Sequence, residues 1–317
     1  MLHISASFLQ RSLEPRRLLY VLISFFATGV AVWLLLHVAW SEIGSSLRNY
    51  SAGSVCLAVL ATVLSFCGLA AYDLIAVRHL RLSNISSLTA LAAGAVSYGV
   101  TNFVGFPWLT GAMVRDVFYQ KSGTGFGALM TVVMSSWIAF WLTAVAIFGV
   151  VLLIQPDLRN STWLITHGAS LGIGLVVVVA ILLTWLSEGR TIAVANHSFD
   201  LLNRRVTLAQ CGAALVDLSG SATVLYLFLP AQAASDLASF FGLFVMAVTA
   251  GILSHIPAGI EAFEATILLG LEGVDPSETT NALLMYRALR TLLPFVLASL
   301  VLVCVSLAKR RHSRHAS

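Results

Sequence analysis

The chain has 317 residues, of which 58% are hydrophobic and only 10% charged, and its mean hydropathy is +0.91. This composition excludes an ordinary soluble domain and indicates an integral membrane protein. The formal net charge of +4 is better explained by membrane orientation than by an anionic partner such as a nucleic acid.

Six apolar stretches are long enough to cross a hydrocarbon core of roughly 30 Å. In chain order they span residues 18–40, 53–77, 124–154, 164–186, 208–229 and 281–307. Two further apolar segments, 88–123 and 238–273, are each interrupted near the middle by proline and polar residues. The expected fold is an all-α polytopic membrane protein with six full crossings and two broken or re-entrant helical hairpins.

The distribution of basic residues predicts which ends of the crossings are cytoplasmic. If both chain termini are cytoplasmic, the first hairpin opens inward and the second outward. Only four basic residues, Arg48, Arg159, Arg287 and Arg290, then lie outside, as the positive-inside rule requires. The first stretch is too long for a signal peptide and is followed by no small-residue cleavage site, so we expect a retained anchor helix.

The two broken segments share a pattern. Pro107 matches Pro257 and Gly123 matches Gly273 at the same offset, and each broken segment is flanked by crossings. This order predicts an inverted-topology repeat, as in many secondary transporters. A single domain of residues 1–317 would then comprise an N-terminal anchor region (1–52), a first repeat (53–154), a linking helix (164–186) and a second repeat (208–307).

Helix breaks in lipid persist only where the freed backbone groups face protein or a wet cavity. Pro107 and Gly111 are expected to break the first hairpin, and Pro257 and Gly259 the second. A matched pair of breaks favours a substrate path, whereas a single one would favour a proline kink that merely tilts a helix.

Glu261 and Glu264 follow the second break and share one helical face. They could cap the restarted helix, because a helix N-terminus stabilises carboxylates there. Alternatively, Glu264 faces a hydrated cavity and binds a proton or cation, or pairs with Arg287 or Arg290, since intramembrane acids seldom lack such a role.

Arg287 and Arg290 open the last crossing on one face. They could be membrane anchors, or they could grip a lipid headgroup, since the planar guanidinium binds two phosphate oxygens at once. Arg115 is the corresponding cation of the first hairpin, although the positive-inside rule alone could explain it. Among the acids, Asp73 could reach water near the end of its crossing, whereas Asp217 is mid-span and requires a partner or a cavity.

"HIPAGIEAFEATILLGLEG" at 255–273, followed by "LLMYRALRTLLPFVL" at 283–297, resembles the closing signature of the lysylphosphatidylglycerol synthetase transmembrane-region family, the flippase-like domain. Pro107 to Arg115 looks like its partner motif. Glu264, Arg287 and Arg115 match the family pattern. Ala258 and Glu261 stand where the family usually has glycine, and Ala112 stands where an acid is common, so the chain looks like a divergent member.

The resemblance implies a stand-alone flippase-like domain without the synthetase domain, in a bacterial plasma (inner) membrane. Its expected partner is a membrane lipid: an anionic or aminoacylated phospholipid, or a polyprenyl or hopanoid lipid. The headgroup path would involve Glu264, Arg287, Arg290, Arg115, Glu261 and Asp217. The alternative is a non-transporting accessory subunit of a lipid-synthesis enzyme.

An intramembrane enzyme is disfavoured. The chain has no H-E-x-x-H metal motif. Asp73 and Asp217 could suggest an aspartyl protease pair, but the Gly-x-Gly-Asp motif is missing. We therefore expect no catalytic residues, no bound metal and no cofactor.

Overall fold

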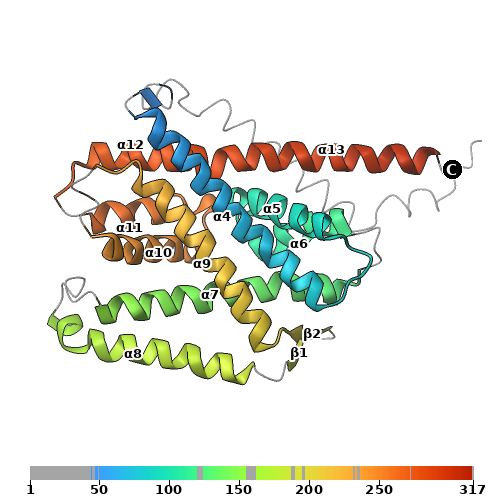
Figure 1. Ribbon diagram of the computed structural model, residues 1–317, viewed down its shortest axis with the longest axis horizontal. Coiled ribbons are helices and arrows are strands. Elements are labelled where there is room, and N and C mark those ends of the chain that lie inside the picture. Colours follow the sequence, from blue (N-terminus) through green and yellow to red (C-terminus); the bar gives the residue numbers. More distant parts are fainter. Residues whose placement is uncertain are drawn as a thin grey trace, which may run out of the picture. The chain divides into compact units, whose positions relative to one another are not determined.

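The computed structural model describes residues 44, 47–48, 50–119, 124–154, 162–186, 190–194, 197–230, 233, 236–271 and 273–315, all within one unit of residues 43–317. The predicted anchor helix at 18–40 lies outside the described residues, as does Gly123 of the first hairpin. The labels in Figure 1 follow the chain and start at α4.

Six described segments are long and apolar enough to span a membrane: Ala52–His79, Ser87–Val104, Gly127–Ile154, His167–Trp185, Arg204–Tyr226 and Pro276–Val305. Five of them match predicted crossings, while Ser87–Val104 is the first arm of the predicted first hairpin. Large apolar side chains on these helices are exposed, for example Leu60, Ile181 and Leu300 at about 60% each. Lipid is the solvent that such faces require, so the prediction of a helical integral membrane protein is confirmed.

The helix α4 (Ala52–His79) crosses α9 (Arg204–Tyr226) at close range, as Figure 1 shows. Gly68 and Gly220 make this approach possible. A Cβ atom on Gly68 would lie 2.6 Å from the carbonyl oxygen of Ala213, and one on Gly220 would lie 2.8 Å from that of Ala61. Small residues at a crossing let two membrane helices pack backbone to backbone, so α4 and α9 form the centre of the described bundle.

The first predicted break falls between α5 (Ser87–Val104) and α6 (Pro107–Tyr119), which pack against each other. Gly105 and Phe106 both have positive φ, +82° and +50°. Glycine just past a helix end and proline at the start of the next helix are favoured termini. The hydroxyl of Thr110 donates to the carbonyl oxygens of Gly105 and Phe106, at 2.9 and 3.0 Å, so the carbonyls freed at this break are satisfied.

The second break separates α10 (Leu237–Leu253) from α11 (Ala262–Gly270), which also pack together, with the short turn η4 (Pro257–Gly259) between them. Ala258 and Glu261 have φ of +57° and +73°. These are the two positions where the related family usually has glycine, the residue that adopts positive φ without a steric cost. Non-glycine residues in this region are strained, and such strain is often found at functional sites.

The last crossing is α12 (Pro276–Arg287) continued by α13 (Leu293–His315), joined by one π-helical turn, η5 (Ala288–Leu292). Figure 1 shows them as one long rod. A π-turn widens the helix locally and is frequent at functional sites. It carries Arg290, which is only 6% exposed.

The remaining described elements lie beside this centre. The helices α7 (Phe126–Ile154) and α8 (Thr162–Trp185) pack side by side. The connection between α8 and α9 contains an antiparallel hairpin of β1 (Arg190–Val194) and β2 (His197–Leu201), in which Ile192 pairs with Phe199. This hairpin is the one addition to the predicted helical fold among the described residues.

Candidate functional site: a cavity between the two helix breaks

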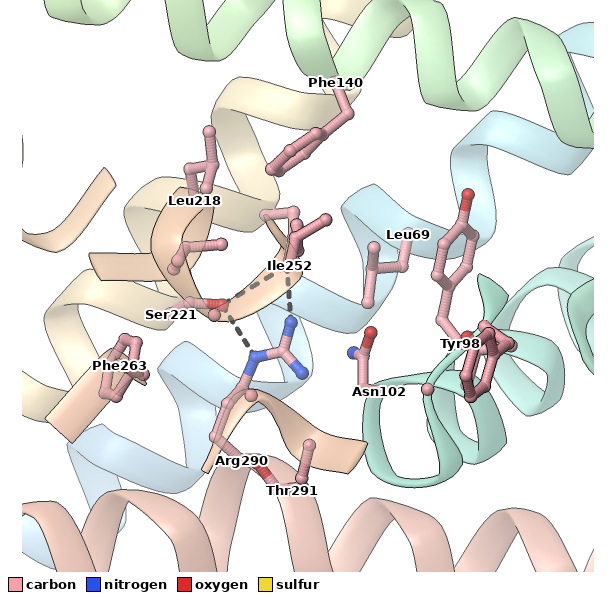
Figure 2. A pocket seen from close by; sticks show the side chains of 18 of the residues that line it. Leu69, Tyr98, Asn102, Phe140, Leu218, Ser221, Ile252, Phe263, Arg290 and Thr291 are labelled. Carbon is pink, nitrogen blue, oxygen red and sulfur yellow. Dashed lines mark hydrogen bonds and ion pairs between the residues drawn. The ribbon is translucent and has the colours of Figure 1, made fainter. Parts of the chain in front are cut away.

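A cavity of about 230 Å³ lies where the two breaks face each other. Gly105 and Phe106 of the first break line it, and so do Ala258 and Gly259 of the second. The break residues thus come from segments about 150 positions apart in the chain and line one cavity. Figure 2 shows this cavity with residues from both halves around it.

Arg290 provides one charged side chain of the cavity. Its Nη2 donates to Oδ1 of Asp217 at 2.7 Å, and its Nε donates to the hydroxyl of Ser221 at 2.6 Å. Figure 2 shows the guanidinium pointing between Ser221 and Asn102. The ring of Phe66 lies 4.8 Å from its Cζ, within cation–π range. Arg290 therefore links the π-turn to α9, while its remaining amino group, Nη1, makes no hydrogen bond to any residue that the structure describes.

Asp217 receives three donors on a single oxygen. Besides Arg290, the hydroxyls of Ser65 and Ser221 donate to Oδ1, at 2.5 and 3.3 Å. The side chain is 10% exposed and lines the cavity. The expectation that this mid-span acid has an interior partner is confirmed, and the partner is Arg290.

Arg287 holds the second break in place. Its Nε donates to Oε1 of Glu264 at 2.6 Å, and its Nη1 donates to the carbonyl oxygen of Ala258 at 2.6 Å. The strained turn of the second hairpin is therefore closed by a side chain from α12, unlike the first, where Thr110 is the local donor. Nη2 of Arg287 and Oε2 of Glu264 are both buried and have no hydrogen-bond partner. Such orphaned groups in low dielectric are costly and mark a place where a ligand or water is expected.

Aromatic and uncharged residues also line the cavity. Tyr72 from α4, Tyr98 and Asn102 from α5, and Trp137 and Phe140 from α7 line it. The hydroxyl of Tyr72 is buried and has no hydrogen-bond partner, although the residue is only 2% exposed. In Figure 2, Tyr98, Asn102 and Phe140 lie across the cavity from Phe263.

Arg115 does not line this cavity. Its Nε and Nη2 donate to the carboxylate of Asp73 at 2.7 to 3.0 Å, and the hydroxyl of Tyr119 donates to the same carboxylate. Arg115 is 2% exposed and Asp73 0%. The expectation that Asp73 could reach water is wrong, because the arginine and tyrosine of α6 enclose it.

The other predicted residues lie around the second break or outside the cavity. Gly259 and His255 line the cavity, whereas Gly111 and Glu261 do not. Glu261 is the residue before α11; it is exposed and makes no side-chain capping hydrogen bond. Its expected capping role is therefore not seen, while Glu264 makes the predicted pair with Arg287.

Sequence reasoning missed Ser65, Tyr72, Asn102 and Ser221. The available signal was weak: Ser221 follows Asp217 by one helical turn, and Asn102 follows Tyr98 by the same spacing. No pattern along the chain indicated that Ser65 would meet Asp217 from the facing helix.

The positions of Asp73 and Asp217 argue against an aspartyl protease pair. Asp73 and Asp217 have separate partners, Arg115 and Arg290 respectively, so neither carboxylate shares a proton with the other in the way that an aspartyl protease pair does. Within the described residues, no group of three or more His, Cys, Asp or Glu side chains could hold a metal ion.

No family model matches the chain. The chain is, however, similar in sequence to three known proteins over most of its length. An uncharacterised protein of Synechocystis is 26% identical over 286 residues, which cover 88% of this chain and 87% of that protein. The inner membrane protein YbhN of Escherichia coli is 28% identical over 300 residues, 90% of each chain. The phosphatidylglycerol lysyltransferase of Bacillus subtilis is 25% identical over 252 residues, 75% of this chain but only 28% of the lysyltransferase.

These likenesses agree with the motifs at both helix breaks, with the six apolar helices and with the membrane character of YbhN. The chain is therefore similar to YbhN over most of its length and to part of the phosphatidylglycerol lysyltransferase, which agrees with the expected resemblance to the lysylphosphatidylglycerol synthetase transmembrane-region family.

Proposed function

We propose that this protein is a lipid translocase whose central cavity receives the headgroup of a phospholipid as it passes between leaflets. The observation that carries the proposal is that both helix breaks and two arginines, Arg287 and Arg290, line one cavity. The acyl chains would remain in lipid beside the exposed apolar residues of the hairpins, such as Phe106 at 46% and Ile256 at 41%.

The headgroup path would consist of Arg287, Arg290 and Asp217 inside the cavity, with Glu264 behind Arg287. Guanidinium groups bind phosphate oxygens in pairs, and Arg290 retains one free amino group. The inverted repeat expected from the sequence would fit this reading, because broken segments at the interface of two repeats form the binding site in many transporters. We assign Arg115 a structural role, since its donors are directed to Asp73.

The relatives support a lipid-related membrane role. One is named for lysyl transfer to phosphatidylglycerol, and the alignment covers about a quarter of its length. The same kinship would also suit an accessory subunit of a lipid-synthesis enzyme. The two functions differ in whether the purified chain moves lipid without a partner.

The experiment reconstitutes the purified chain in liposomes and measures exposure of inner-leaflet phospholipid to a membrane-impermeant headgroup reagent. A variant that fills the cavity, Asn102→Trp, provides the test, and Ile181→Trp provides the matched control on the exposed face of α8. We expect exposure with the natural chain and with Ile181→Trp, and background exposure with Asn102→Trp. Background exposure with the natural chain would overturn the translocase proposal and favour the accessory role.

A further inference from the structure

The charged wall of the cavity is electrically balanced. Asp217 pairs with Arg290 and Glu264 with Arg287, so the formal charges of these four side chains cancel. Burying a charge without a counter-charge is unfavourable in low dielectric. A headgroup with a net charge would leave an uncompensated charge in the cavity, whereas a headgroup with no net charge would not.

The two arginines of the cavity retain hydrogen-bond donors that the described residues do not use. Among the described residues, Nη1 of Arg290 has no hydrogen-bond acceptor, and Nη2 of Arg287 is buried without a partner. Both side chains line the cavity. Unused guanidinium donors are suited to phosphate oxygens, so this side places the phosphate of a bound headgroup.

Aromatic residues of the cavity lining offer the contacts that stabilise an ammonium group. Trp137 and Phe140 line the cavity, and tryptophan is the strongest cation–π partner among the side chains. Tyr72 lines the cavity, and its hydroxyl is buried without a hydrogen-bond partner among the described residues, so its oxygen has capacity left to accept from an N–H donor. Figure 2 shows Asn102 and Tyr98 on this side, facing Arg290.

The size of the cavity restricts what enters. Its volume of about 230 Å³ is below the range of about 300–1,000 Å³ that is typical of pockets for drug-sized ligands. It can hold a compact headgroup but not the acyl chains of a lipid.

From these four observations we infer that the cavity binds a zwitterionic headgroup, with its phosphate at Arg287 and Arg290 and its ammonium at Tyr72, Trp137 and Phe140. This inference rests on the proposed function and names the class of lipid: an aminophospholipid of no net charge, of the phosphoethanolamine type. It separates this chain from relatives named for a lysylated lipid, whose headgroup carries a net positive charge.

Binding of water-soluble headgroups to the purified full chain tests the inference. Isothermal titration calorimetry would compare glycerophosphoethanolamine, glycerophosphoglycerol and inorganic phosphate at equal ionic strength. We expect glycerophosphoethanolamine to bind about tenfold more tightly than glycerophosphoglycerol, the ratio that a single cation–π contact of about 1.4 kcal/mol provides. Equal or tighter binding of glycerophosphoglycerol or of inorganic phosphate would overturn it.

Tyr72→Phe is the informative variant because it removes only a hydroxyl that has no partner, which leaves folding unharmed. We expect it to reduce the preference for glycerophosphoethanolamine several-fold at an unchanged melting temperature. Tyr226→Phe, at the end of α9 and outside the cavity lining, is the matched control and should retain the preference. Full preference in both Tyr72→Phe and a second variant, Trp137→Leu, would overturn the assignment of the ammonium side.

Liposomes separate this inference from the proposed function. If the natural chain translocates phosphatidylglycerol as fast as phosphatidylethanolamine, the headgroup class is wrong while the translocase stands. If it translocates neither lipid but retains the tenfold binding ratio, the translocase is wrong while the headgroup site stands.

Discussion

Nη2 of Arg290 lies 2.7 Å from Oδ1 of Asp217 inside the protein, with side-chain exposures of 7% and 10%. The two residues are 73 positions apart and come from the π-turn and from α9. Ser65 of α4 donates to the same oxygen. One ion pair thus joins three elements at the edge of the cavity, and removing either charge leaves the other buried alone.

Asp217→Asn is expected to destabilise the protein by about 3–5 kcal/mol, because Arg290 keeps its charge without a counter-charge. The double variant Asp217→Leu with Arg290→Met should recover most of this loss, because it removes both buried charges. Chemical unfolding in detergent micelles measures both. Near-additive losses in the double variant would contradict the pairing.

The Asp73–Arg115 pair predicts a different outcome. Arg115 donates to both carboxylate oxygens of Asp73, and lysine cannot reproduce this two-pronged geometry. Arg115→Lys is expected to cost about 1.5–3 kcal/mol, the worth of hydrogen bonds to charged groups, while the folded variant binds headgroup normally. A loss of headgroup binding at natural stability would place Arg115 in the path after all. Thermal unfolding and calorimetry on one preparation distinguish these results.

The close crossing of α4 and α9 predicts position-dependent effects of alanine. Gly68→Ala would place a methyl group 2.6 Å from the Ala213 carbonyl oxygen, and overpacking of this kind costs about 1–3 kcal/mol. Gly212→Ala, on α9 with nothing within 4 Å of its Cβ position, is the control. It should be neutral or stabilising by up to about 1 kcal/mol, because alanine favours helix. Equal stabilities for the two variants would argue against the crossing.

The second break predicts that one substitution stabilises the protein. Ala258 has φ of +57°, which costs a residue with a side chain about 1–2 kcal/mol relative to glycine. Glycine also gains entropy in the unfolded chain, which offsets about 0.4–1 kcal/mol. Ala258→Gly should therefore raise the free energy of unfolding by a few tenths to about 1 kcal/mol. Ala262→Gly, in the first turn of α11, should lower it, and the reverse order would show that Ala258 is not strained.

Much of the fold was predictable because the hydrophobic periods of membrane helices are strong local signals. Five crossings and both breaks follow from runs of apolar residues and from Pro107 and Pro257. The strain at the second break could be suspected only at Ala258 and Glu261, where the family pattern has glycine. Its physical cause, positive φ, required the structure.

The candidate site was predictable only in part, because its contacts join distant segments. Arg287, Arg290, Glu264 and Asp217 are conspicuous as charges in apolar sequence, and all four form ion pairs. The partner of each charge depends on how the helices pack. The sequence around Asp217 does not indicate which cation pairs with it, and the structure shows that it is Arg290. Tyr72 and Asn102 carry no charge, so nothing in the sequence distinguished them from packing residues.

The central claim is that a hydrated headgroup path passes through the cavity between the two breaks. It is tested most directly by labelling Asn102→Cys with a membrane-impermeant maleimide in proteoliposomes, after replacing the native cysteines 56, 67, 211 and 304. Ile181→Cys on the exposed face of α8 is the control. The account predicts that Asn102→Cys reacts and that the bound label stops lipid translocation, while Ile181→Cys neither reacts nor loses translocation. An unreactive Asn102→Cys, or translocation that continues after complete labelling, would contradict it.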